Sequence, residues 1–351
     1  MKIKATFKKY ILQFKLPGGT SRGVLHTKET YFLKIIDDQN TGIGECAIFK
    51  GLSADDRPDY EEKLQWLCDH IHLDKDLLLH ELIEFPSIQF GLEQALLSII
   101  SKDTFELFPS DFTNGNDSIA INGLIWMGNR SFMQKQIKEK LKAGFTTIKL
   151  KIGAIDFHTE LDLLKSIRND FPANEIELRV DANGAFHPNE ALEKLKQLSE
   201  FQLHSIEQPI KAGQWEKMED LCKKTPLSIA LDEELIGVFK RSDKERMLQR
   251  INPQYIILKP SLIGGFQGTD EWIELANKYG IDWWITSALE SNIGLNAIAQ
   301  YTYIQQNKLP QGLGTGGLFT NNCISPLTVK NGVLFYDVKD KNGWDISILN
   351  I

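Results

Sequence analysis

The sequence predicts an α/β protein, built as a (β/α)7β barrel with an N-terminal α+β capping domain. After Ser118, short apolar strands alternate with amphipathic helices, and the strand ends recur at intervals of roughly 25 to 30 residues. Such regular crossovers are typical of a parallel sheet that closes into a TIM-like barrel. Before that point strands precede helices, as in a separate α+β unit. The length of 351 residues suits a barrel with one additional domain.

The first 112 residues are expected to form the capping domain. Apolar and polar residues alternate in its first half, which indicates strands, and the apolar spacing becomes helical from Tyr60 onward. We expect strands over 3–14, 30–37 and 42–46, then helices beginning at Tyr60 and spanning 87–101.

The segment Pro109–Asp117 is rich in Asp, Asn, Ser, Thr and Gly and is expected to link the domains. The barrel is predicted over 118–320, and residues 321–351 are expected to return to the capping domain. An open doubly wound sheet is the alternative, but no G-x-G-x-x-G motif follows the first strand. The predicted strand ends are Trp126, Lys151, Asp181, Glu207, Asp232, Lys259 and Thr286.

Composition and charge argue against some classes of function. The chain is 42% apolar and 25% charged, and 40 Lys and Arg against 47 Asp and Glu give a net charge of −7. A mildly acidic chain without a basic run is poorly suited to nucleic acid or a membrane surface. We expect neither a signal peptide nor a membrane span, because lysines interrupt the N-terminal apolar residues and no long apolar run exists.

The four cysteines have no C-x-x-C spacing, so neither a zinc nor a redox motif is predicted. They are expected to be reduced, buried residues of a cytoplasmic protein. The expected partner is a small-molecule carboxylate substrate, and the sequence sets no oligomeric state.

Charged residues end five successive predicted strands. Any one of them alone would be read as a solvated charge at a strand end. Five in a row on apolar strands are costly unless they are paired or bind a metal ion. Because the carboxyl ends of barrel strands meet at one face, we expect these side chains to converge there.

Three of the five charges are carboxylates on adjacent strands, namely Asp181, Glu207 and Asp232. Carboxylates brought close together repel each other unless a cation neutralises them. An all-oxygen ligand set favours Mg²⁺, with Mn²⁺ as the alternative. Histidine and cysteine are absent from these strand ends, which argues against zinc.

Two lysines, Lys151 and Lys259, would flank this metal from opposite sides of the barrel mouth. A metal ion between two lysines is suited to removing a proton next to a carboxylate, because the cation stabilises the enediolate while a lysine moves the proton. The arrangement matches one that is described for enolase-superfamily sites.

The chain resembles the enolase superfamily, within its muconate lactonising subgroup, over essentially its whole length. The motifs that carry the resemblance are K-x-K at 149–151, D-A-N at 181–183, E-Q-P at 207–209, A-L-D-E at 230–233 and K-P-S-x-x-G-G at 259–265. The resemblance implies that Asp181, Glu207 and Asp232 hold Mg²⁺ and that Lys151 and Lys259 are the opposed acid/base pair.

The resemblance further implies a lyase of menaquinone biosynthesis. The expected reaction is the Mg²⁺-dependent syn dehydration of 2-succinyl-6-hydroxy-2,4-cyclohexadiene-1-carboxylate to 2-succinylbenzoate. The first alternative is an N-acylamino acid racemase or dipeptide epimerase that uses the same lysine pair. Dipeptide epimerases of this subgroup carry a D-x-D motif after the last barrel strand, where this chain has Leu318–Asn322 instead. A non-catalytic barrel binding protein is a less favoured alternative, because a binder needs no opposed bases.

Sequence patterns that are weaker than these motifs indicate further residues that support the site. Arg179 is predicted to lie near Lys151 and to lower the pKa of that lysine, with a structural ion pair as the alternative. Asn183 is expected to bond an acid/base or a metal ligand, and Ser261 to hold a second substrate carboxylate. The remaining substrate-binding or supporting candidates are Lys149, Ser287 and Glu290.

Two loops could close over the substrate and help set specificity. Gly18–Gly23 is a polar stretch between two strands, and it makes Arg22 a candidate contact. Leu52 and Ser53 form a second candidate loop. Gly312–Gly317 resembles a phosphate-binding loop, but a close backbone approach at the eighth strand explains it equally well.

Overall fold

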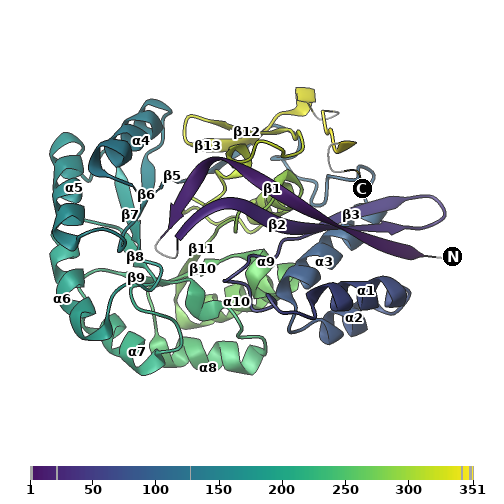
Figure 1. The fold of residues 1–351 in the computed structure, drawn as a ribbon, viewed down its shortest axis with the longest axis horizontal. Helices are drawn as coiled ribbons and strands as arrows, with labels where there is room; N and C mark the ends of the chain where they lie inside the picture. The colour runs from purple at the N-terminus through teal and green to yellow at the C-terminus, as the bar shows by residue number, and fades with distance from the viewer. Residues whose placement is uncertain (1–2, 21–22, 127, 341–342, 348–349, 351) are drawn as a thin grey trace.

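The computed structural model describes residues 3–20, 23–126, 128–340, 343–347 and 350. A parallel barrel sheet with helices on its outside lies beside an antiparallel cap sheet packed on its own helices (Figure 1). A small antiparallel sheet near the C-terminus completes the described structure. The predicted fold class, a (β/α)7β barrel with an α+β cap, is confirmed.

The cap sheet has the strand order β1-β2-β3, and β3 packs closely on α3 because its glycines lack side chains. A Cβ atom on Gly44 would lie 2.0 Å from the carbonyl oxygen of Gly91. Helix α2 was not predicted, although Asp74 signals its start by accepting a hydrogen bond from the amide of Asp76. The cap elements are β1 (Lys4–Thr20), β2 (Gly23–Ile36), β3 (Thr41–Cys46), α1 (Tyr60–His70), α2 (Lys75–Glu81) and α3 (Pro86–Ile100).

Strands β1 and β2 form a longer ribbon than predicted. The stretch expected to be a loop from Gly18 is strand as far as Thr20. The pairing register shifts between Gln13 and Gly18, so the ribbon bends without losing its partner strand. Figure 1 shows the ribbon arching from the cap across the barrel.

Seven parallel strands form the barrel sheet in sequence order from β5 to β11. Each ends at its predicted residue or one position before it. The strands are β5 (Gly123–Ile125), β6 (Thr147–Lys151), β7 (Glu177–Asp181), β8 (Ser205–Glu207), β9 (Ile229–Leu231), β10 (Tyr255–Leu258) and β11 (Asp282–Ile285).

The helices that follow these strands are α4 (Arg130–Lys142), α5 (Phe157–Asp170), α6 (Pro188–Ser199), α7 (Trp215–Lys224), η1 (Glu233–Leu235), α8 (Arg241–Ile251), α9 (Pro260–Ile263), α10 (Gly265–Tyr279) and α11 (Asn292–Ile304). Figure 1 shows α4 to α8 on the outside of the barrel.

Two isolated bridges close the barrel where the eighth strand was expected. Gln311 bridges Ile121, and Gly312 bridges Thr286, both in parallel orientation. The eighth strand is therefore a short segment that lies between β11 and β5. Polar side chains of the two neighbouring segments lie on either side of it.

Side-chain alternation explains why charged residues fit among buried strands. Ile148 and Leu150 on β6 are fully buried in the main apolar core. Lys149 and Lys151, between and after them, line a pocket instead. Side chains on one face of β6 thus pack in the apolar core, and those on the other face line the pocket.

The C-terminal part contains η2 (Gly316–Leu318), β12 (Leu327–Lys330), β13 (Val333–Tyr336) and η3 (Val338–Asp340), and β13 also pairs with β4 (Ser118–Ala120). Asn321 contacts the cap strand β1: its side-chain oxygen accepts from the amide of Gln13 at 2.8 Å, and its carbonyl accepts from the Tyr10 hydroxyl at 2.8 Å. All four cysteines are free and buried, as expected. Within the described ranges, no helix is long and apolar enough to cross a membrane.

Glu45 joins the cap to the barrel. This fully buried carboxylate on β3 accepts hydrogen bonds from the Ser291 amide at 3.0 Å, the Gly294 amide at 2.9 Å and the Ser291 hydroxyl at 2.5 Å. These groups begin α11, so Glu45 satisfies the otherwise unpaired amides at a barrel helix N-terminus. The Thr30 hydroxyl donates a further bond to Glu45 at 2.8 Å.

Replacing Glu45 with alanine should therefore destabilise the protein. The change leaves two buried amides without acceptors, and we expect the free energy of unfolding to fall by about 3 kcal/mol. Thermal unfolding measures the effect, with the exposed Glu62→Ala as the matched control. A melting temperature equal to that of the control would show that this contact does not hold the cap to the barrel.

Candidate active site

The five predicted catalytic and metal-binding residues meet at the carboxyl ends of the barrel strands. Lys151 pairs in register with Asp181, and Asp181 pairs with Glu207, across three adjacent strands. Asp232 directly follows β9, and Lys259 directly follows β10. The three carboxylates are at most 2% exposed.

Lysine ammonium groups lie against these carboxylates. Lys149 bridges two of them, with its Nζ 3.1 Å from Asp181 Oδ2 and 2.7 Å from Glu207 Oε2. Lys151 Nζ lies 2.5 Å from Asp181 Oδ2. Lys259 forms an ion pair with Asp232, and its Nζ is 4.0 Å from Glu207 Oε1.

The mutual charges shift the pKa values of these groups. Burial alone would raise the pKa of Asp181, but the ammonium groups of Lys151 and Lys149 lower it. Burial and the neighbouring carboxylates of Asp181 and Asp232 raise the pKa of Glu207 well above its usual value. Burial would lower the pKa of Lys259, but the charges of Asp232 and Glu207 raise it. The carboxylate cluster therefore requires positive charge around it.

The same residues fit a hard divalent cation. Their donor atoms are all oxygens, and Glu207 Oε1 is buried without a hydrogen-bond partner among the described residues. As the side chains stand, with lysines against the carboxylates, no group of three Asp, Glu, His or Cys in the described ranges has a metal-holding arrangement. The unpaired oxygen of Glu207, and its raised pKa, are the observations that favour an additional cation.

Asn183 holds the end of Lys151. Its side-chain oxygen accepts from Lys151 Nζ at 2.8 Å, and its side-chain nitrogen donates to Glu233 Oε1 at 2.9 Å. Its backbone amide donates to Asp181 Oδ1 at 3.0 Å. The expected bond between Asn183 and an acid/base residue is present, and it fixes the position of the ammonium group.

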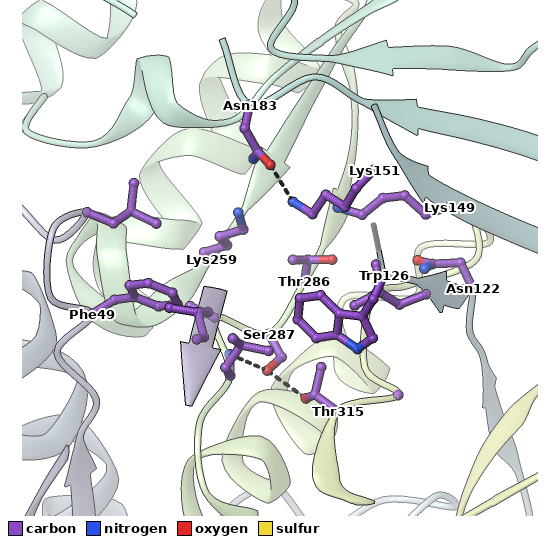
Figure 2. A pocket seen from close by; sticks show the side chains of 17 residues that line it. Phe49, Asn122, Trp126, Lys149, Lys151, Asn183, Lys259, Thr286, Ser287 and Thr315 are labelled. Atoms are coloured by element: carbon purple, nitrogen blue, oxygen red, sulfur yellow. Dashed lines mark hydrogen bonds between the residues drawn. The ribbon is translucent and has the colours of Figure 1, made fainter. Parts of the chain in front are cut away.

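A pocket opens above the lysines and is lined by residues from both domains. Lys151 and Lys259 reach it from two sides in Figure 2. Its apolar wall comes from both domains and consists of Leu25, Phe49, Leu52, Leu124, Trp126 and Leu289. Leu52 is thus in the predicted position, whereas Ser53 is turned away and accepts a hydrogen bond from the Phe49 amide.

Ser261 and Glu290 do not line the pocket, so the structure does not support the expected contact of Ser261 with a substrate carboxylate, and Glu290, a substrate-binding or supporting candidate, has a supporting position. Both are fully buried, and the Ser261 hydroxyl donates to Glu290 at 2.5 Å. Ser287 does line the pocket, but its hydroxyl also donates to Glu290, at 2.6 Å. A buried carboxylate needs such donors, so this serine pair serves Glu290.

The described hydrogen bonds and ion pairs of Arg179 do not include Lys151, so no contact supports the predicted tuning of that lysine. Its guanidinium donates to Glu177 at 2.8 Å and to the carbonyl of Pro310 at 2.9 Å. It also lies 4.4 Å from the ring centroid of Trp284. These partners make Arg179 a structural residue of the barrel interior, which was the alternative interpretation. Arg22, also predicted as a contact, lies outside the described residues.

None of the residues 318–322, which stand in place of the D-x-D motif, lines the pocket. Asn321 bonds to β1, and the side-chain oxygen of Asn322 accepts from the amide of Asn292 at 2.9 Å. Among the described residues of the pocket wall there is no Asp or Glu. The described part of the pocket wall therefore offers no carboxylate to a substrate ammonium group.

Sequence reasoning missed the apolar wall and the polar residues Asn122 and Thr315. Nothing in the local pattern marks Phe49 or Leu289 as pocket residues, because the two domains meet there only in the folded chain. Trp126 and Thr286 were recognised as strand ends, and that position is the signal that could have assigned them to the site.

Comparison with known proteins identifies the family. Residues 133–349 match the family model described as enolase C-terminal domain-like. The chain belongs to the enolase superfamily.

Within that superfamily the chain groups with the o-succinylbenzoate synthases. It is 46% identical to the o-succinylbenzoate synthase of Desulfotalea psychrophila, over 95% of this chain and 98% of that protein. The crystal structure of MenC from the same organism matches with a TM-score of 0.85 at 43% identity, covering 95% of this chain and all of that one. These relatives confirm the prediction that the chain is a lyase of the enolase superfamily.

The epimerases are more distant. The L-Ala-D/L-Glu epimerase of Francisella tularensis subsp. novicida is 31% identical, but over 53% of this chain and 51% of that protein. The substrate-liganded L-Ala-D/L-Glu epimerase of Bacillus subtilis shares the fold with a TM-score of 0.82 at 19% identity, covering 96% of each chain.

Proposed function

We propose that this chain is a Mg²⁺-dependent dehydratase that converts 2-succinyl-6-hydroxy-2,4-cyclohexadiene-1-carboxylate into 2-succinylbenzoate, in the menaquinone pathway of the cytoplasm. The observation that carries the proposal is the pair of lysines, Lys151 and Lys259, on two sides of a pocket beside three buried carboxylates. The o-succinylbenzoate synthase relatedness supports the choice of substrate. In this proposal residues 1–112 cap the barrel of 118–320, and 321–351 return to the cap.

Lys151 is proposed as the acid/base residue. In its neutral form it removes the proton from the carbon next to the substrate carboxylate, and the C–OH bond then breaks. The protonated lysine gives that proton to the departing hydroxyl on the same face, so water leaves and the ring becomes aromatic. Lys259 stays protonated on the other side and stabilises the negative charge that develops on the carboxylate.

Asp181, Glu207 and Asp232 are proposed to hold the Mg²⁺ ion, with Mn²⁺ as an alternative. The bound ion would supply positive charge to the substrate carboxylate and so stabilise the enediolate form. Lys149, which bridges Asp181 and Glu207, would keep those two carboxylates ionised and in position.

Epimerisation of a dipeptide or racemisation of an N-acylamino acid is the second candidate, because it uses the same lysine pair. The absence of Asp and Glu from the described pocket wall disfavours a ligand that carries a free ammonium group. An N-acylamino acid lacks that ammonium group, so its racemisation remains open as a side activity.

Lys259 separates the two candidates experimentally. In the dehydratase this lysine supplies charge, so we expect Lys259→Arg to keep at least about tenfold more activity than Lys259→Ala. In an epimerase it must move a proton, which arginine cannot do near neutral pH. Steady-state kcat on the cyclohexadiene measures the ratio, and equal loss in the two variants would contradict the assignment.

Growth of a bacterial strain that lacks its own o-succinylbenzoate synthase tests the proposed function. Expression of this chain should restore menaquinone-dependent growth, and Lys151→Ala should not. Failure of the well-expressed wild-type chain to restore growth, while 2-succinylbenzoate added to the medium does, would refute the proposal.

A further inference from the structure

Most polar side chains of the pocket wall already donate their hydrogens to the protein. The Ser287 hydroxyl gives its hydrogen to Glu290, and the Thr315 hydroxyl gives its hydrogen to Ser287 at 2.8 Å. Because a carboxylate can only accept hydrogen bonds, the direction of donation from Thr315 through Ser287 to Glu290 is fixed. Asn183 is engaged by Lys151 and Glu233. Neither hydroxyl has a hydrogen left to offer a substrate, and one of the two amide hydrogens of Asn183 is already given to Glu233.

Asn122 and Thr286 are different. Both line the pocket, and they are 6% and 7% exposed. Neither side chain has a hydrogen-bond partner in the part of the chain that the structure describes, and both are open to the pocket. Figure 2 shows the Asn122 amide and the Thr286 hydroxyl directed toward one another across the pocket wall.

The backbone at 311–312 runs between the segments that carry these two residues. Gly312 bridges Thr286, while the backbone N–H of Asn122 donates to the carbonyl of Gln311 at 2.9 Å. A Cβ atom on residue 312 would lie 1.5 Å from the Thr286 hydroxyl oxygen. The glycine at this position is therefore needed for the hydroxyl to face the pocket, which favours the close backbone approach over a phosphate-binding loop.

The geometry points to a specificity subsite in which Asn122 and Thr286 donate hydrogen bonds to the keto oxygen of the substrate's succinyl substituent. The inference rests on the proposed function and deepens it. Two neutral donors suit a neutral acceptor, whereas the terminal carboxylate would favour a cation, and the cations on the described wall are the three lysines of the metal site. The subsite would orient the ring so that the carbon to be deprotonated faces Lys151.

Binding of three ligands to the Mg²⁺-loaded protein tests the subsite by calorimetry. The ligands are 2-succinylbenzoate, 2-butyrylbenzoate, which keeps the ketone but lacks the terminal carboxylate, and 2-butylbenzoate, which has neither. Thr286→Val and Asn122→Leu keep the side-chain shape and remove the donors. Thr315→Val is the matched control, because its hydroxyl is committed to Ser287.

We expect each donor variant to raise the Kd of both ketone ligands by about tenfold and to leave that of 2-butylbenzoate within about twofold. Thr315→Val should change all three alike. Equal losses for all ligands, no loss for any, or a loss confined to 2-succinylbenzoate would each overturn the assignment to the keto oxygen. If the wild-type protein binds no 2-succinylbenzoate, the proposed function fails and the inference with it. If it binds and the variants do not discriminate, the inference alone fails.

Discussion

Replacing Lys151 with alanine should lower kcat by about 10³- to 10⁴-fold, the usual contribution of a positioned acid/base group. Lys151 lines the pocket and its Nζ is held by Asp181 and Asn183, so its loss removes the group that is proposed to move the proton. Lys151→Arg keeps a positive charge against Asp181 but cannot act as a base near neutral pH. We therefore expect it to be nearly as inactive as the alanine variant.

The exposed Lys165→Ala is the matched control for this prediction and should have wild-type kcat. Circular dichroism and the melting temperature establish that the inactive variants are folded. A folded Lys151→Arg protein that retains more than about a tenth of the wild-type kcat would contradict the role assigned to Lys151.

Removing divalent cations should abolish turnover, and Mg²⁺ or Mn²⁺ should restore it. The reason is that burial and two neighbouring carboxylates raise the pKa of Glu207, whose Oε1 atom has no hydrogen-bond partner among the described groups. Developing negative charge on the substrate would be costly beside such a cluster without a cation. The measurement is kcat after dialysis against EDTA and again after addition of each metal.

Glu207→Gln is the matched variant for the metal prediction, because it keeps the shape of the side chain and removes its charge. We expect it to need a higher Mg²⁺ concentration for half-maximal activity. Full activity of the wild-type protein in excess EDTA would refute the metal assignment.

The barrel and its charged residues could be predicted from the sequence because both follow from local patterns. A buried parallel strand is an apolar run, and an Asp, Glu or Lys that ends the run marks the end of the strand. For this reason Asp181 and Glu207 fall on the last residue of their strands, and Asp232 and Lys259 fall one residue beyond theirs.

The features that were missed depend on contacts between distant segments. Arg179 has the inward position that alternation predicts, but its partner Pro310 lies far away in the sequence. Ser261 and Glu290 were placed at the site correctly by region, yet their mutual hydrogen bond removes them from the pocket wall. The β1–β2 ribbon extends into its predicted loop, as far as Thr20, because strand pairing continues beyond a bulge. Spacing along the chain does not encode such choices.

The central claim is that this pocket eliminates water from a cyclohexadiene carboxylate. One preparation of the Mg²⁺-loaded protein tests it, by comparing dehydration of 2-succinyl-6-hydroxy-2,4-cyclohexadiene-1-carboxylate with exchange of the α-proton of L-Ala-L-Glu in D₂O. The account predicts a kcat/KM for dehydration on the order of 10⁴ M⁻¹ s⁻¹ or above, within the range of natural enzymes, and dipeptide exchange at least about a hundredfold slower. Rapid exchange of the dipeptide without dehydration of the cyclohexadiene would contradict it.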